Sequence, residues 1–293
     1  MKGIRLAGGK GSILYPMTKA VSKPLIPIYD KPMVYYPLTV LLMSGCDEIM
    51  LITAPPDVEA YQRLLGDGSQ FGVHIRYGVQ YVARGIADAF LIAEDVIAGA
   101  PCGLILGDQL FYGSDLDDLL HVASQRREGA TIFGYPVKNP TAYGVVEFDE
   151  NNNVLSIEEK PQCPRSKYAV PGLYFYDGDA VALAKTLTPS ARGELEITAL
   201  NEAYLRRGRL HVELMERGMA WLDTGTPEGM LNAAQYVEAV QSRQGLYIAC
   251  PEEVAWHKGF ISAEQVRAIG QELKMTEYGQ YLLSLVEDKC WKN

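Results

Sequence analysis

The sequence predicts an α/β protein with a doubly wound mixed sheet, a small β insertion and a helical C-terminal extension. Three observations support this prediction. Over residues 3–137, short apolar runs alternate with helical patterns, which is typical of parallel strands joined by right-handed crossovers. Between residues 143 and 160, two β-rich segments flank the turn-forming tract Asn151–Asn153. The last ~45 residues show mostly helical patterns, by the same periodicity criterion.

The first half of the chain supplies the doubly wound part. We expect ligands to bind beyond the carboxyl ends of its strands, as in other open α/β sheets. Its predicted strands are Gly3–Ala7, Glu48–Thr53, His74–Gln80, Cys102–Gly107 and Ala130–Val137. Its predicted helices are Lys31–Gly45, Asp57–Leu65, Ile86–Ala98 and Asp115–Arg127.

The second half is predicted to continue the same body, because no repeat, low-complexity tract or linker interrupts it. Its predicted strands are Tyr143–Asp149, Val154–Lys160, Tyr168–Tyr176 and His211–Met215. Helices are predicted at Glu196–Arg207 and Gly229–Ser242, and Leu282–Val286 forms an apolar stripe near the end. We therefore expect an α/β domain over residues 1–240, with halves meeting near residue 140, and a helical extension over residues 241–293.

Composition narrows the function. The 293 residues carry a formal net charge of −9 and contain no basic block, so a nucleic-acid partner is not expected. No apolar run approaches the ~20 residues that span a bilayer, and no signal peptide is recognisable, so we expect a cytoplasmic protein without a membrane partner. The five cysteines are scattered without C-x-x-C spacing, which indicates reduced thiols rather than metal ligands.

A glycine-rich loop follows the first predicted strand. Gly8, Gly9 and Gly11 fall within four positions, and glycine lets backbone N–H groups approach a phosphate closely. The loop matches neither the dinucleotide fingerprint nor the Walker A motif. The loop therefore predicts a nucleotide site but does not specify a reaction.

Two aspartates are candidate metal ligands. Asp108 ends a predicted buried strand, and Asp223 lies in the turn Trp221-Leu-Asp-Thr-Gly-Thr226. Mg²⁺ prefers carboxylate oxygens together with substrate phosphates, so the two could clamp one ion on a triphosphate. On position alone, the alternative for Asp108 is that it caps the following segment, and an Asx-turn at Asp223 is as well supported as a metal ligand.

Charged residues near strand and helix ends are the remaining candidates. Lys23 lies in an apolar neighbourhood, which is unusual for a solvated lysine. Lys160 precedes Pro161, which ends strand pairing and leaves the lysine pointing outward; a solvated surface role is the simpler alternative. Glu194 lies in the segment Arg192–Thr198, which resembles an acidic helix entry but could also bind sugar hydroxyls.

Together these segments resemble the sugar nucleotidylyltransferases, over nearly the whole chain. The most specific segments are Pro27-Ile-Tyr-Asp-Lys-Pro-Met33, Leu65-Gly-Asp-Gly-Ser-Gln70, Tyr143-Gly-Val-Val-Glu-Phe-Asp149, Gly172-Leu-Tyr-Phe-Tyr-Asp177, Gly193-Glu-Leu-Glu-Ile-Thr198 and Trp221-Leu-Asp-Thr-Gly-Thr226. The resemblance implies a Rossmann-like nucleotidyltransferase fold with a nucleotide half (1–140) and a sugar half (141–240). It also implies Mg²⁺-dependent transfer of a thymidylyl group from dTTP to glucose 1-phosphate, with release of pyrophosphate.

The resemblance also implies roles for individual residues. Asp108 and Asp223 would hold Mg²⁺, and Lys23, Lys160 and Asp108 would serve catalysis. The nucleotide would contact Leu6, Gly8, Gly9, Lys10, Gln80, Gly85 and Asp108. The sugar phosphate would contact Gly144, Glu159, Lys160, Val170, Tyr174, Arg192 and Glu194. Family members are commonly homotetramers whose C-terminal region helps to build a regulatory site for the end product.

The chain departs from the family pattern mainly around the triphosphate. Ile13 stands where the family has the arginine that grips the leaving pyrophosphate, and Pro24 replaces a glutamine. The base-reading segment Tyr81–Ala89 also differs, and Gln109 replaces an asparagine. An arginine at such a position can be worth ~10³ to 10⁵ in rate. We hypothesise that a nearby cation replaces it, most plausibly Lys10, with Arg5 and Arg84 as the other candidates.

Three functions stay open on these grounds. The first is the Mg²⁺-dependent transferase that the resemblance implies. The second is a catalytically impaired paralogue that binds a sugar nucleotide and has a regulatory or assembly role. The third is a transferase with a different base preference, because Gly85-Ile-Ala-Asp-Ala89 departs from the thymidylyl pattern.

Overall fold

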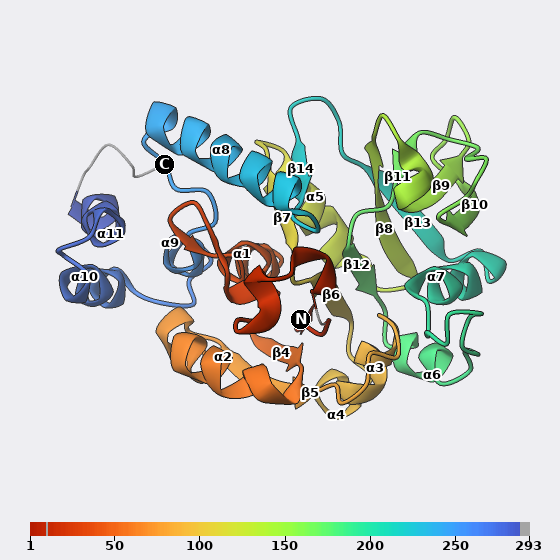
Figure 1. Cartoon of the computed structure of the whole chain (residues 1–293), viewed down its shortest axis with the longest axis horizontal. Helices are drawn as coiled ribbons and strands as arrows, with labels where there is room; N and C mark the ends of the chain where they lie inside the picture. Colours follow the sequence, from red (N-terminus) through yellow and green to blue (C-terminus); the bar gives the residue numbers. More distant parts are fainter. Residues whose placement is uncertain (10, 288–293) are drawn as a thin grey trace.

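A mixed ten-stranded sheet forms the centre of the molecule in the computed structural model, which describes residues 1–9 and 11–287 (Figure 1). The strand order is β10-β9-β11-β8-β12-β6-β1-β4-β5, with β13 paired to β8. The strands are β1 (Lys2–Leu6), β4 (Glu48–Thr53), β5 (His74–Val79), β6 (Cys102–Leu106), β8 (Ala130–Pro136), β9 (Gly144–Phe148), β10 (Val154–Glu159), β11 (Tyr168–Ala169), β12 (Leu173–Tyr176) and β13 (Leu210–Leu214).

The parallel part of the sheet is the one that the sequence predicted. β1 lies between β4 and β6, with Ile4 opposite Met50 on one side and Leu104 on the other, and β5 pairs with β4. Parallel strands covered on both faces are apolar throughout, which explains the continuous run over Glu48–Thr53. The observed bounds of β4 match the prediction, and the others differ by a few residues at most.

The two halves of the chain interleave at β12. This strand lies between β6 and β8 and is antiparallel to both, so Tyr174 is opposite Leu104 and Ile132. The predicted single strand Tyr168–Tyr176 is wrong, because Pro171 lacks an N–H and the pairing partners change there. Because one sheet runs through both halves, a boundary near residue 140 stays a functional prediction.

Helices cover both faces of the sheet. They are α1 (Tyr35–Met43), α2 (Val58–Leu65), α3 (Asp88–Ile92), α4 (Glu94–Ile97), α5 (Leu116–Gln125), α6 (Ala180–Ala184), α7 (Ile197–Arg206), α8 (Pro227–Gln244), α9 (Pro251–His257), α10 (Ala263–Glu272) and α11 (Glu277–Glu287). The predicted helix Lys31–Gly45 begins only at Tyr35, because Lys31–Pro32 forms β3 against β2 (Pro27–Ile28). The predicted helix Ile86–Ala98 is divided into α3 and α4 at Ala93.

The C-terminal helices pack against the first half of the chain. Figure 1 places α10 and α11 at the end of the molecule opposite β9 and β10. Ala255 and Leu282 share one hydrophobic cluster with Leu41 and Leu65, so α9 and α11 belong to the same core as α1 and α2. The predicted extension boundary at residue 240 falls inside α8. Among the described helices, none is both long and apolar enough to cross a membrane.

A two-stranded ribbon positions the site. β7 (Gln109–Tyr112) follows β6 directly and pairs antiparallel with β14 (Ala220–Asp223). In this register Asp223 lies opposite Gln109, next to the end of β6. Neither strand of this ribbon was predicted from the sequence.

Candidate nucleotide and sugar-phosphate site

The glycine-rich loop forms the floor of a cavity of about 250 Å³ at the carboxyl end of β1. Gly9 has a φ of 154° and would have nothing within 4 Å of an added Cβ, so the backbone here is open to a ligand. Leu6, Gly8 and Gly9 line the cavity, as predicted for nucleotide contacts, together with Lys23 and Asp108.

Lys23 and Asp108 form an ion pair at the mouth of this cavity. The Lys23 Nζ lies 2.5 Å from Oδ2 of Asp108, and the lysine side chain is only 13% exposed. Burial alone would raise the pKa of Asp108, but the Lys23 ammonium and the Gln109 amide, 3.0 Å from Oδ1, lower the pKa below its ordinary value. Asp108 is therefore ionised at neutral pH.

Asp223 converges on Asp108 from a distant part of the chain. Thr224 donates from its N–H and its hydroxyl to the carbonyl of Asp108, at 3.3 and 2.9 Å, which ties the two segments together. Burial and the nearby Asp108 carboxylate raise the pKa of Asp223. Its Oδ1 accepts the Gly225 N–H at 2.9 Å, so the Asx-turn alternative also describes this residue.

The donor set suits a hard divalent cation. Two carboxylates with mutual repulsion and a lysine beside them are the kind of partial shell that Mg²⁺ completes with water and phosphate oxygens. Within residues 1–9 and 11–287, no third histidine, cysteine or carboxylate joins them into a larger cluster. The Asx-turn fixes the orientation of Asp223 and leaves its second oxygen available.

A second cavity of about 190 Å³ continues from the first and shares Ile86, Leu106 and Asp108 with it. Asp223 also lines this second cavity, so it shares that space with Asp108, which lines both cavities. Predicted sugar-phosphate residues line the rest of the cavity, namely Gly144, Glu159, Lys160, Val170 and Tyr174.

Glu159 is held in place by a neighbouring helix. The Thr198 hydroxyl, at the start of α7, donates to Oε2 of Glu159 at 2.6 Å. A Cβ at Gly144 would lie 3.4 Å from the same oxygen, so the glycine leaves room beside the carboxylate. Such fixed acceptors next to open space are what sugar hydroxyls require.

Lys160 adopts a strained backbone conformation with a φ of 46°. Its N–H donates to the Tyr143 carbonyl at 3.0 Å, and its Nζ lies 3.9 Å from Oε1 of Glu159. Strained backbone that is held by its surroundings is common at functional sites. Lys160 lines the cavity, although half of its side chain is exposed.

Gln80 lines a third cavity of about 360 Å³, which Gly8, Gly9, Lys19 and Lys23 also line. The Gln80 amide nitrogen lies 3.0 Å from Oδ2 of Asp88 and 3.4 Å from the Gly85 carbonyl. Gly85 itself packs its backbone against Leu195, where an added Cβ would be 2.4 Å from the carbonyl oxygen.

Other predicted residues do not line the three cavities. Arg192 forms ion pairs with Glu196, at 2.9 Å, and with Glu194, at 3.7 Å, so the roles of Arg192 and Glu194 stay predictions. Arg5 is fully buried over the Tyr61 ring with one contact to the Gly107 carbonyl, and Arg84 pairs with Asp88. The placement of Lys10 lies outside the described residues.

Three residues that support the site were not predicted from the sequence. Lys19 lines the cavity together with Lys23, which follows it by four positions. The signal for Lys19 in the sequence is this pair of lysines close to the glycine loop. Thr198 ends a motif that had been singled out for its carboxylates. Gln109 accepts hydrogen bonds from the indole of Trp221, at 2.6 Å, and from the Gly172 N–H, at 3.1 Å. No local pattern signals these long-range contacts.

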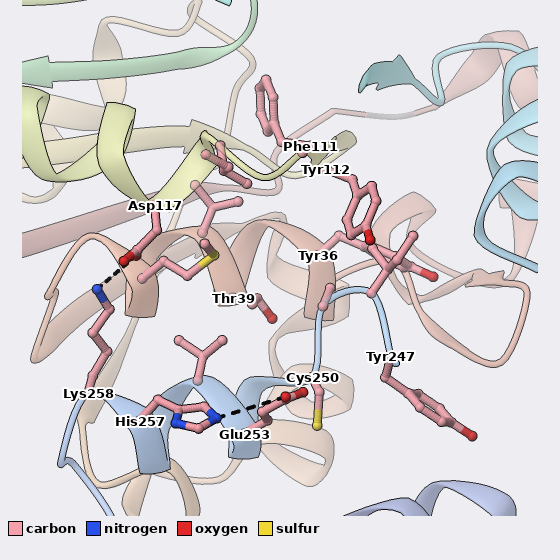
Figure 2. Close-up of a pocket in the computed structure, with 17 residues that line it drawn as sticks. Tyr36, Thr39, Phe111, Tyr112, Asp117, Tyr247, Cys250, Glu253, His257 and Lys258 are labelled. Carbon is pink, nitrogen blue, oxygen red and sulfur yellow. Dashed lines mark hydrogen bonds and ion pairs between the residues drawn. The ribbon is translucent and has the colours of Figure 1, made fainter. Parts of the chain in front are cut away.

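A separate cavity of about 310 Å³ lies between α1, β7 and α9 (Figure 2). It shares no lining residue with the three cavities above. Tyr36, Phe111 and Tyr112 provide aromatic surface. At the edge of the cavity an ion pair joins Lys258 to Asp117, and the His257 Nε2 lies 4.0 Å from Oε1 of Glu253. The C-terminal extension therefore contributes a wall to a second potential binding site.

The fold and the joined cavities define an α/β protein with a glycine-lined cavity at the carboxyl end of β1, joined to a second cavity at Asp108. Residues 2–240 match the family model described as nucleotidyl transferase, and the chain belongs to that family. Membership points to dependence on a divalent metal ion. The predicted Rossmann-like nucleotidyltransferase fold is thus confirmed.

Similar proteins carry one recurring name. A glucose-1-phosphate thymidylyltransferase of Neisseria gonorrhoeae is 55% identical over 98% of this chain and 99% of its own length. One from Mycobacterium tuberculosis is 52% identical over 98% and 99%. A Bacillus anthracis crystal structure, assigned to the same enzyme and complexed with a sucrose, has a TM-score of 0.74 and 40% identity, covering 80% of this chain and 94% of that one. A UDP-glucose pyrophosphorylase with 23% identity and a TM-score of 0.71 shares the fold.

Proposed function

We propose that this chain transfers a thymidylyl group from dTTP to glucose 1-phosphate, with Mg²⁺, to give dTDP-glucose and pyrophosphate. The observation that carries the proposal is that Asp108 lines both the glycine-lined cavity and the adjoining cavity, where Asp223 joins it. The relatives at 52–55% identity bear the name of this activity, which supports the same assignment.

The reaction needs positioning and charge neutralisation more than covalent chemistry. A phosphate oxygen of glucose 1-phosphate attacks the α-phosphorus of dTTP, and the bond to the pyrophosphate leaving group breaks. Mg²⁺ held by Asp108 and Asp223 would neutralise phosphate charge as the bond to the leaving group breaks. Lys23 places its ammonium beside the same phosphates, and Lys160 binds the phosphate of the sugar.

Lys19 is our candidate for the charge that the loop lacks at position 13. Ile13 carries no charge, and because its side chain is 74% exposed it packs little against the rest of the chain. Lys19 and Lys23 line one cavity with Gly8 and Gly9, but Lys23 is already paired with Asp108. Among the described residues Lys19 has no ion-pair partner. We therefore assign Lys19, together with Lys23, to the β- and γ-phosphates.

A pyrophosphate-release assay with glucose 1-phosphate, Mg²⁺ and each of dTTP, UTP, ATP, CTP and GTP tests the proposal. We expect release with dTTP. Release with another base alone would indicate altered base preference. Binding of dTDP-glucose without release from any triphosphate would indicate a regulatory or assembly role, the alternative that the exposed Ile13 favours.

We further propose a cytoplasmic homotetramer that binds its end product in the cavity of Figure 2. Aromatic walls and the Lys258 ammonium at its edge support binding of a base and a phosphate. Light scattering would measure the mass of the assembly. Inhibition by a dTDP-sugar that does not compete with dTTP, and that is lost in Lys258→Met, would support this use of the cavity.

A further inference from the structure

Gln80 is held in a single amide orientation by a buried carboxylate. Asp88, at the start of α3, has a side chain only 1% exposed, and its Oδ2 accepts a hydrogen bond from the Gln80 Nε2 at 3.0 Å. The Gly85 carbonyl lies 3.4 Å from the same nitrogen. Both acceptors lie on the amino side of the Gln80 amide, and an ionised carboxylate can only accept.

The carbonyl of Gln80 consequently points the other way, toward the nucleotide loop. A Cβ at Gly8 would lie 2.5 Å from the Gln80 Oε1, so this oxygen packs against the backbone of Gly8. Gln80 is 7% exposed and lines the cavity that Gly8 and Gly9 also line. Gln80 therefore presents a hydrogen-bond acceptor to the cavity, and no donor.

We propose that Asp88 is a specificity-determining residue that selects thymine or uracil by fixing the Gln80 carbonyl toward the base. The imide N3–H of these two bases is a donor, whereas N3 of cytosine and N1 of adenine are acceptors that would face the Gln80 oxygen unfavourably. A site built to pair with a donor rejects an analogue that lacks it, because its own polar group is left unpaired. This inference rests on the proposed function.

Arg84 forms an ion pair with the second oxygen of Asp88. Its guanidinium lies 3.0 Å from Oδ1 of Asp88, and the arginine side chain is 62% exposed. The arginine compensates the buried charge from the solvent side, while Gln80 occupies the side toward the cavity. Arg84 therefore belongs to the support of the base site and not to the triphosphate.

The test is a comparison of Asp88→Asn with Asp95→Asn, which changes an exposed aspartate that pairs with Arg76. Asparagine can donate as well as accept, so Gln80 can turn its amide over. We expect the ratio of kcat/KM for dTTP to that for dCTP to fall about tenfold in Asp88→Asn, through the nucleotide KM, with the KM for glucose 1-phosphate unchanged. Asp95→Asn leaves Asp88 and Gln80 unchanged and lies outside the three cavities, so it should change the ratio less than about twofold, below one hydrogen bond.

A double-mutant cycle separates positioning from structural damage. If Asp88 acts through Gln80, Asp88→Asn has no further effect on the ratio in a Gln80→Met background. An unchanged ratio in Asp88→Asn, or an equal effect in that background, would overturn the inference. Because turnover could fail for other reasons, the affinities for dTDP-glucose and CDP-glucose are measured by calorimetry in parallel. A wild-type protein that binds both equally contradicts the inference, whereas absent turnover with intact discrimination contradicts only the proposed function.

Discussion

The sugar end and the phosphate end of the site are built in different ways. Around the sugar cavity, one side-chain hydrogen bond joins Thr198 of α7 to Glu159 of β10, and another joins Trp221 of β14 to Gln109 of β7. At the phosphate end, the glycine loop offers backbone groups and the exposed side chain of Ile13. Lys19 lines the cavity with the glycines of this loop. The first end depends on fixed shape and the second on charge. Charge can be supplied from more than one position, so we expect the phosphate end to tolerate the substitution at position 13.

The largest expected effect is at the junction of the two ends. Asp108→Asn should lower kcat with dTTP and glucose 1-phosphate by about 10³-fold or more, the scale of losing preorganised electrostatic stabilisation. Its shape and its contact to Gln109 are retained, so unfolding temperature serves as the control for folding. A variant that keeps more than a tenth of the wild-type kcat would contradict the account.

Glu159→Gln probes the sugar end. A hydrogen bond to a charged acceptor is worth about 1.5–3 kcal/mol, so kcat/KM for glucose 1-phosphate should fall about 10- to 100-fold. The KM for dTTP should not change, because Glu159 lines only the sugar cavity among the three. Glu158→Gln, at the exposed neighbouring position, is the matched control. Equal losses of kcat/KM for glucose 1-phosphate and for dTTP would contradict the division of the site into two ends.

Lys19→Met probes the phosphate end. We expect kcat/KM for dTTP to fall about tenfold, less than for a buried ion pair because Lys19 is exposed. Ile13→Arg should restore most of that loss, since it returns a cation to the same loop. Lys138→Met, at another exposed lysine, is the control. If Ile13→Arg raises the wild-type rate by several orders of magnitude, Lys19 does not supply the missing charge.

The smallest effect concerns stability and pH. The raised pKa of Asp223 means that its ionised form is disfavoured in the folded protein. Stability from this group is therefore present at low pH and lost as pH rises through the folded pKa. Without divalent ions, Asp223→Asn should raise the unfolding temperature at neutral pH by about 1–4 °C, and the difference should vanish in acid. A variant less stable than wild type at neutral pH would show the sign to be wrong.

The sequence predicted the strands best where both faces are buried, and the site best where strands end. Glu48–Thr53 and the pairing of β1, β4, β5 and β6 follow from apolar runs and helical spacing. β12 between β6 and β8, and the ribbon of β7 and β14, could not be predicted, because they depend on partners more than 40 residues away along the chain.

The candidate site shows the same division. Lys23 and Asp108 were identifiable because one lies in an apolar setting and the other ends a strand. The link from Asp88 to Gln80 and that from Thr198 to Glu159 were not, because a buried hydrogen bond between segments leaves no periodic signal. The hypothesis that Arg84 replaces the loop arginine is not supported, because its guanidinium pairs with Asp88.

The proposed activity requires that Asp108 and Asp223 bind one divalent ion together. Its most direct test is titration of Mn²⁺, followed by electron paramagnetic resonance, into the protein saturated with dTDP-glucose. The account predicts one tightly bound ion per chain, with affinity at least tenfold weaker in either Asp108→Asn or Asp223→Asn. Unchanged stoichiometry and affinity in the double variant would contradict it.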